Sequence, residues 1–280
     1  MSARRMLRMG AGAAAIGLLA VSIAVLRAPV PTFDAVRDGE RGSEALLLDR
    51  HGAPLQRMRL DRSKRQLDWV TLDAVSPAMI EAISASEDRR FWRHGGVDAL
   101  GVAAALRDNV GRDRPRGAST ITMQLAKLLR IEAGGRDARD VWAKLAEMRD
   151  AAALEARWTK SQILEAYLNL VAFRGELVGL DAAARGLFGK AASGLDRVEA
   201  AILASLVRAP NATPARLAKR ACALLAQRAE VLDANCSEAM LAVAGLPTRT
   251  FRVRGAASDA PHLARRMLTR PNERVRSTID

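Results

Sequence analysis

The hydrophobic pattern of this chain begins with an uninterrupted apolar run near the amino end. Residues 9–26 are eighteen consecutive positions without a charged side chain, and Arg4, Arg5 and Arg8 precede them. A helix of this length spans about 27 Å, just enough for the hydrocarbon core of a bilayer. The arginines predict a cytoplasmic amino terminus and a chain that continues across the membrane. The alternative is a cleaved signal peptide, since Ser22-Ile23-Ala24 fits a cleavage site; the length of the run favours an uncleaved anchor.

The pattern after this run predicts a small β element followed by a long helical body. Residues 29–43 carry proline, glycine and charges and are typical of a linker. The segment 44–55 predicts a strand, a turn at His51-Gly52 and a second strand. Beyond it, abundant alanine and leucine with few β-branched runs favour helices. The expected fold class is therefore mainly α with a small β-hairpin.

The first helix of this body carries an acidic residue on its apolar stripe. Ser76-Pro77 predicts the helix start, with serine as N-cap and proline in the first turn. Ile80, Ile83 and Glu87 then follow at i, i+3 and i+7. A stripe position faces the core or a cleft, where a carboxylate suits a general base. The alternative is a salt bridge to one of the arginines that follow Glu87.

A second predicted helix has a polar line beside its apolar stripe. Gly117 precedes Ser119, the expected N-cap. The apolar stripe consists of Ile121, Leu125 and Leu128. The polar line consists of Thr120, Gln124 and Lys127. Free amides at a helix start and a lysine ammonium can both bind a phosphate oxyanion, although a capped surface helix with a solvated lysine explains the same pattern.

A third helix is predicted over residues 137–157, and further helices over about 160–170 and 199–207. In the third, the expected buried stripe is Val141, Leu145, Met148 and Ala152. Lys144, Glu147, Ala151 and Glu155 line an adjacent face. A Lys-x-x-Glu pair there forms either a simple helix salt bridge or the wall of a site.

Charge and cysteine content narrow the function classes. The formal net charge is +13, and the 49% hydrophobic content supports a packed core. Such a charge suits nucleic acid, an anionic membrane surface or a phosphorylated substrate. No zinc spacing, RNP-like strand or helix-turn-helix pattern accompanies it, which argues against nucleic acid. Cys222 and Cys236 are too far apart to bridge on one straight helix; a turn near residues 233–235 would allow a disulfide.

These motifs, in this order, resemble the peptidoglycan glycosyltransferase domain of class A penicillin-binding proteins, family 51 of the glycosyltransferases. The resemblance covers about residues 44–225, and five motifs with compatible spacing make chance negligible. Two segments, 173–179 and 206–212, resemble the 1C subgroup. The first four motifs are Glu87-Asp88-x-x-Phe91-x-x-His94-x-Gly96, Gly117-x-Ser119-Thr120-Ile121-Thr122-Met123-Gln124-Leu125-Ala126-Lys127, Lys144-x-x-Glu147-x-x-x-Ala151-x-x-Leu154-Glu155 and Ile163-Leu164-Glu165-x-Tyr167-Leu168-Asn169. The fifth is a group of short matches at Gly179, residues 182–184, Phe188-Gly189-Lys190, Glu199-Ala200-Ala201 and Ala209-Pro210.

The resemblance implies a lysozyme-like helical domain that polymerises lipid II by inverting transfer to its 4-hydroxyl. It implies Glu87 as general base and Glu147 as assistant at the leaving pyrophosphate, directly or through bound Mg²⁺ or Mn²⁺. It implies lipid II, the growing glycan strand, the membrane and cell-wall synthesis proteins as partners, but no nucleic acid. The implied location is the bacterial inner membrane, with the catalytic domain in the periplasm. The implied substrate-binding residues are Asp88, Phe91, His94, Ser119, Thr120, Gln124, Lys127, Lys144, Glu155 and Asn169.

The chain departs from the family pattern at two places. Ala143 stands where the family has an arginine before Lys144, and Ala118 stands where it has a second glycine. The first loses a phosphate-binding cation, which Arg139 or Arg149 would have to replace. The alternative function is therefore a weak, membrane-anchored relative that binds lipid II or acts as a scaffold.

The expected domain organisation has four parts. Residues 1–28 form a cytoplasmic tip and anchor, 29–43 a linker, and 44–245 the glycosyltransferase domain. Residues 246–280 are predicted to be a linker towards a transpeptidase domain that this chain lacks. The organism, metal, oligomeric state, anchor cleavage and truncation are not determined by the sequence.

Overall fold

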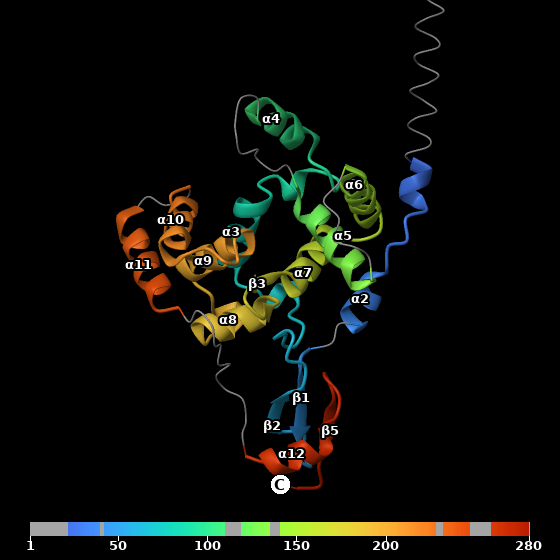
Figure 1. The fold of residues 1–280 in the computed structure, drawn as a ribbon, viewed down its shortest axis with the longest axis vertical. Coiled ribbons are helices and arrows are strands. Elements are labelled where there is room, and N and C mark those ends of the chain that lie inside the picture. Colours follow the sequence, from blue (N-terminus) through green and yellow to red (C-terminus); the bar gives the residue numbers. More distant parts are fainter. Residues whose placement is uncertain are drawn as a thin grey trace, which may run out of the picture. The chain divides into compact units, whose positions relative to one another are not determined.

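The fold is described from a computed structural model, which describes residues 22–39, 42–109, 119–134, 141–227, 232–246 and 259–279 (Figure 1). The chain divides into two compact units, each described by itself. The first comprises residues 1–33 and 92–163, and the second comprises residues 34–91 and 164–280. The described residues are mainly helical, as the sequence predicts.

Most of the predicted membrane anchor, residues 9–21, lies outside the described residues, as do Gly117 and residues 137–140. Residues 22–26 are helical. Within the described ranges, no helix combines the length and apolar character needed to cross a membrane.

Three helices make up most of the described part of the first unit. The pair α5 and α6 packs together (Figure 1). The helices of this unit are α4 (Ala99–Asn109), α5 (Ile121–Glu132) and α6 (Val141–Glu155).

Helix α6 buries a different face from the one predicted. Val141 and Trp142 are 72% and 79% exposed and Leu145 is also exposed, whereas Glu147, Ala151 and Leu154 are buried. The predicted apolar stripe was therefore wrong in its first two turns, and the side that carries Glu147 packs inward instead, with Lys144 half-exposed at its edge. The physical reason is that α6 packs against α5, and the carboxylate of Glu147 is accommodated there because Lys144 and Arg130 pair with it.

The second unit contains the remaining helices and a small sheet. Helix α3 begins after Ser76 with Pro77 in its first turn, and α7 spans Lys160–Leu170; both predictions are confirmed. The Ser76 side chain does not cap α3, because its hydroxyl donates to the carbonyl of Leu195 at 2.6 Å. Helix α7 begins in the first unit and ends in the second. The helices are α2 (Phe33–Gly39), α3 (Pro77–Glu87), α8 (Leu180–Phe188), α9 (Arg197–Arg208), α10 (Pro214–Leu225) and α11 (Leu232–Ala244).

Helix α9 lies at the centre of the helical part of the second unit, packed by α3, α10 and α11 (Figure 1). A capping box starts it, in which Asp196 accepts from the Glu199 amide and Glu199 accepts from the Asp196 amide. This satisfies two of the amides that a helix start leaves open. Buried residues then continue from Val198 to Leu206, so α9 is the central core helix of this unit.

The predicted hairpin is confirmed as β1 (Glu44–Leu48) and β2 (Pro54–Arg59), which pair antiparallel around Gly52. A third strand, β5 (Arg274–Arg276), pairs parallel with β1. Helix α12 (Pro261–Met267) packs its Ala264 against Ala45 and Leu47 of β1. The described part of 246–280 therefore completes the sheet, where the sequence predicts only a linker.

A separate two-stranded sheet consists of β3 (Ala172–Arg174) and β4 (Leu177–Val178).

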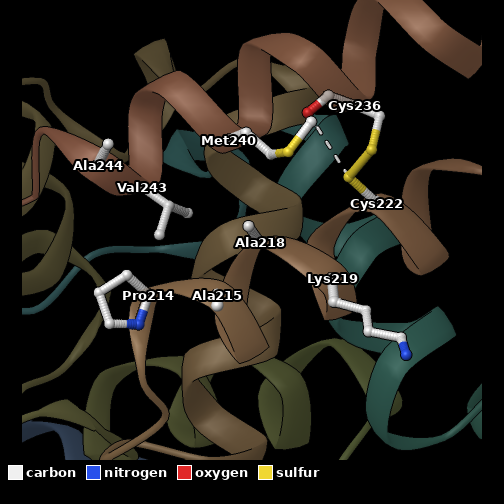
Figure 2. A pocket seen from close by; sticks show the side chains of 9 residues that line it. All are labelled: Pro214, Ala215, Ala218, Lys219, Cys222, Cys236, Met240, Val243 and Ala244. Atoms are coloured by element: carbon white, nitrogen blue, oxygen red, sulfur yellow. Dashed lines mark hydrogen bonds between the residues drawn. A yellow bond between two sulfur atoms is a disulfide. The ribbon is translucent and has the colours of Figure 1, made fainter.

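A disulfide links α10 to α11 (Figure 2). Cys222 and Cys236 have their Cα atoms 4.9 Å apart, so the disulfide that the sequence left open is formed. Beside it the two helices enclose an apolar groove of about 430 Å³ whose lining includes Ala218, Met240 and Val243. The bond thus links two helices that also pack against each other.

Loss of this disulfide should lower the free energy of unfolding. A crosslink that closes a loop of about 15 residues contributes about 3 kcal/mol, mainly by restricting the unfolded chain. We expect the Cys222→Ser/Cys236→Ser variant to unfold at a lower denaturant concentration than the wild type. Wild-type protein under reducing conditions should unfold at the same midpoint as the variant. An unchanged midpoint in both experiments would contradict a stabilising crosslink.

Candidate active site

The candidate general base stands at the carboxyl end of α3. Glu87 is the last residue of this helix and is partly exposed. A carboxylate at this end faces the negative pole of the helix dipole, an unfavourable position for the fold. Positions that break a local rule of stability in this way are typical of functional sites.

Neighbouring groups hold this end of α3 in place. The Ser86 hydroxyl lies 3.0 Å from Oε1 of Glu87 and 3.4 Å from the carbonyl of Ala204 in α9. Arg208, at the end of α9, donates to the Ser86 carbonyl at 3.0 Å. A cation satisfies an open carbonyl at a helix end and is favoured by the dipole. The position of Glu87 is therefore fixed through its neighbour.

The charge of Glu87 influences the phenol of Tyr167 in the same unit. Burial, and in second place the negative charge of Glu87, raise the pKa of Tyr167 well above its ordinary value. The phenol therefore stays neutral at all pH values at which the enzyme would work.

Three predicted binding residues of the second unit have structural contacts. Asp88 is buried and its amide donates to the Ser84 carbonyl at 3.0 Å, which ends α3. Phe91 is completely buried in the core. The side-chain nitrogen of Asn169 donates to the backbone carbonyls of Val70 and Glu165, and its side-chain oxygen accepts from the backbone amide of Val70. Phe91 and the side-chain amide of Asn169 therefore have structural roles among the described residues.

In the first unit, four polar side chains from α5, α6 and the preceding turn form a cluster, which we call the cation cluster. The Lys144 ammonium donates to the Ser119 hydroxyl at 2.7 Å and to Oε2 of Glu147 at 2.8 Å. Arg130 lies 3.6 Å from Oε1 of Glu147. The sequence predicted Ser119, Lys144 and Glu147 as site residues, and the structure brings these three together.

The cation cluster has donors left for a ligand. An ammonium has three N–H donors, and Lys144 uses two of them within the described residues. The Nε of Arg130 is buried and has no hydrogen-bond acceptor in the described part of the chain. Buried donors are rarely left unpaired, so this position favours an anionic ligand.

The start of α5 differs from the prediction by one residue. Thr120 is the N-cap, and its hydroxyl accepts from the Met123 amide at 3.1 Å; the expected N-cap, Ser119, binds Lys144 instead. The Thr120 hydroxyl also donates to the Gly96 carbonyl at 2.5 Å. Thr120 therefore connects the end of the first motif to the start of the second rather than facing a ligand.

The other predicted residues of this unit are less closely associated with the cluster. Glu155 accepts from Thr122 at 2.7 Å and pairs with Lys160 at 2.6 Å, away from the Lys144 contacts. Gln124, Lys127 and His94 are partly buried. Glu87 belongs to the second unit and Glu147 to the first.

The described residues do not fit a metal centre held by the protein. They contain no group of three histidine, cysteine, aspartate or glutamate side chains that could hold an ion. Both oxygens of Glu147 face cations, Lys144 and Arg130. A divalent cation on Glu147 would have to displace these ion pairs, so we derive no step through such an ion.

The sequence missed two residues of this environment. Arg130 contributes the second cation, where the sequence suggested Arg139 or Arg149; Arg149 is paired with Asp150 at 2.6 Å and Arg139 lies outside the described residues. Arg208 supports α3 from a helix far along the chain. Both positions look like ordinary surface arginines in the sequence, and no local pattern signals their role.

Replacement of Gly96 by alanine should destabilise the first unit. Gly96 has φ +84°, and an added Cβ would lie 2.7 Å from the Ala151 carbonyl oxygen. Strain and overpacking together should lower the free energy of unfolding by about 2–4 kcal/mol. The matched control is Gly95→Ala, because a Cβ there meets nothing within 4 Å. Thermal unfolding measures both; equal melting temperatures for the two variants would contradict the close approach.

Comparisons with known proteins show the family to which this chain is similar. A family model described as transglycosylase matches residues 51–233. A biosynthetic peptidoglycan transglycosylase of Rhodospirillum centenum is 38% identical over 210 residues, which cover 74% of this chain and 81% of that one. Proteins with the same description from Aeromonas hydrophila and Yersinia pseudotuberculosis are 41% and 40% identical, each over 51% of this chain. Of these two relatives the chain spans 59% and 58% of the length.

A solved structure also matches. Penicillin-binding protein 1A of Haemophilus influenzae aligns with 85% of this chain and 27% of its own, at 17% identity and a TM-score of 0.40.

Proposed function

The chain belongs to the transglycosylase family and is a peptidoglycan glycosyltransferase, and we propose that it polymerises lipid II into glycan strands. The observation that carries this proposal is the cation cluster, in which Lys144 contacts Ser119 and Glu147 while the buried Nε of Arg130 has no acceptor in the described residues. Such a cluster suits the pyrophosphate that links a growing glycan to its lipid carrier.

In the proposed reaction Glu87 acts as the general base. Its carboxylate takes the proton of the 4-hydroxyl of the incoming lipid II, and the hydroxyl oxygen attacks the anomeric carbon of the donor sugar. The new C–O bond forms as the bond from that carbon to the pyrophosphate oxygen breaks, which inverts the configuration. A base of this kind contributes about 10²–10⁴-fold to the rate.

The cation cluster stabilises the negative charge that the departing pyrophosphate gains. Lys144 and Arg130 supply positive charge, and Ser119 orients the ammonium of Lys144. Glu147 holds both cations in place, so its role is to position them. Because Arg130 approaches from α5, the alanine at position 143 does not leave Lys144 as the sole cation.

We further propose that the chain is anchored in the inner membrane and works on its outer face. Three arginines precede the apolar run of residues 9–26, which orients an anchor with its amino end in the cytoplasm. The Cys222–Cys236 disulfide supports an oxidising compartment, because such bonds persist outside the cytoplasm. Within the family, residues 173–179 and 206–212 support placement in the 1C subgroup of penicillin-binding proteins.

Polymerisation of fluorescent lipid II in detergent tests the proposal. We expect the wild-type chain to produce glycan strands that a muramidase digests, and to leave lipid-free glycan intact. Cleavage of lipid-free glycan would assign a lytic activity instead. Binding of lipid II without any polymer would assign the alternative, a binding or scaffold relative. A parallel assay with a chelator tests the predicted Mg²⁺ or Mn²⁺ requirement, and co-purification with cell-wall synthesis proteins tests the predicted partners.

A further inference from the structure

The segment that follows the apolar run is held by the end of α6. Residues 22–26 are helical, and the last carbonyls of a helix have no partner within it. The Arg157 guanidinium donates to the carbonyl of Leu26 at 2.7 Å and to that of Ala28 at 2.9 Å. A third contact reaches the Val30 carbonyl at 3.5 Å. One arginine therefore donates hydrogen bonds both to the last carbonyl of this helix and to carbonyls of the chain that follows it.

The next residue continues this contact. The Trp158 indole donates to the Pro31 carbonyl at 3.1 Å, and its ring meets that of Phe33 edge-to-face at a centroid distance of 5.4 Å. Trp158 is 4% exposed, and Ala28 and Phe33 are buried as well. Two adjacent side chains thus bind residues 26–33 along their whole length.

Arg157 and Trp158 are themselves fixed to α6. Their amides donate to the Leu154 carbonyl at 2.9 and 2.7 Å, in a turn that closes the helix. The same helix carries Lys144 and Glu147 of the cation cluster. Glu147 lies eight residues before the last residue of α6, which corresponds to about 12 Å of rigid helix, and Arg157 follows in the closing turn. All of these residues belong to the first unit.

We propose that Arg157 and Trp158, here called the exit clamp, set the height of the cation cluster above the membrane surface. This proposal rests on the proposed function. A lipid-linked substrate presents its pyrophosphate at the bilayer surface, because its hydrocarbon tail remains in the membrane. The exit clamp holds the chain where it leaves the apolar run, and α6 joins the clamp to the cation cluster. The clamp therefore fixes the position of the cation cluster relative to that surface. The two clamp residues are positioning residues and contact no reacting atom.

The first test is independent of activity. Trypsin can cut after Arg27 only when the backbone there is released from the clamp. Arg157→Met loses the charged hydrogen bonds to this backbone, so the rate of this cut in detergent should rise about tenfold or more. The rate is measured by mass spectrometry of the fragment that begins at Ala28. Trp158→Phe keeps the ring and removes only the indole donor, so a smaller increase is expected. Rates equal to wild type in both variants would overturn the clamp.

The second test compares polymerisation of lipid II in detergent with polymerisation in phospholipid vesicles. Arg157→Met and Trp158→Phe should keep wild-type rates in detergent and lose about tenfold in vesicles, since small misplacements of reacting groups are costly. Arg37→Met, which removes an exposed arginine paired with Asp34, is the matched control and should not change either rate. Equal losses in both media would assign only a structural role and overturn the proposal. Absence of polymer from wild type in both media would refute the proposed function, while the trypsin test would still decide whether the clamp exists.

Discussion

Replacement of Glu87 by glutamine should lower kcat of lipid II polymerisation by about 10²–10⁴-fold, the usual contribution of a general base. Glutamine keeps the size of the side chain and an oxygen that can accept from Ser86, so the end of α3 should remain intact. It cannot take the proton of the acceptor hydroxyl. The measurement is the initial rate of glycan formation in detergent at saturating lipid II.

The matched control for this substitution lies on the same helix. Glu81 is an exposed carboxylate of α3, six residues before Glu87. We expect Glu81→Gln to polymerise lipid II within about twofold of the wild-type rate, as surface substitutions usually have small effects. A Glu87→Gln variant that folds and retains a tenth or more of the wild-type kcat would contradict the assignment of Glu87 as base.

Replacement of Lys144 by methionine should lower kcat/KM by about 10²–10³-fold, comparable to the loss of one preorganised donor in other enzymes. Methionine retains the unbranched apolar stem of the side chain but removes the ammonium and its contacts at 2.7 Å to Ser119 and 2.8 Å to Glu147. Glu147 then has only Arg130, at 3.6 Å, as a cation among the described residues. Because the interaction grows as the pyrophosphate departs, kcat should fall more than KM rises.

Lys160 provides the control for Lys144. It belongs to the same unit and pairs with Glu155 at 2.6 Å, outside the cation cluster. Lys160→Met should leave kcat/KM within about threefold of wild type, because the ion pair that it removes involves neither Lys144 nor Glu147. A similar loss in both lysine variants would indicate a general effect of charge or stability. Lys144→Arg should recover part of the activity, since it restores the positive charge.

Local sequence signals determined the helices that carry the motifs. Ser76-Pro77 marks the start of α3, and the start and end of α7 were predicted where the structure has them. The His51-Gly52 turn was sufficient to predict the hairpin of β1 and β2. These elements depend on caps, turns and proline, whose effects are contained within a few residues. For that reason the sequence alone could establish them.

The face that each helix buries was less accessible to sequence reasoning. In α6, hydrophobicity favoured Val141 and Leu145, yet these are exposed and Glu147 is buried. The Lys144–Glu147 spacing fits a surface salt bridge as well as a buried one, because an i, i+3 pair contacts in either case. Only the packing against α5, which also contributes Arg130, shows which case applies.

The sequence by itself determined the helical class, the motif order and the chemical identity of the groups at the site, because these depend on local patterns. The tertiary structure decided which distant groups support them: Arg130 beside Glu147, Arg208 on the end of α3, and Arg157 on residues 26–30. It also decided that β5 joins β1 across more than two hundred residues. Contacts of this kind carry no local signal, since any exposed arginine or short strand could form them, and only the folded chain selects the partner.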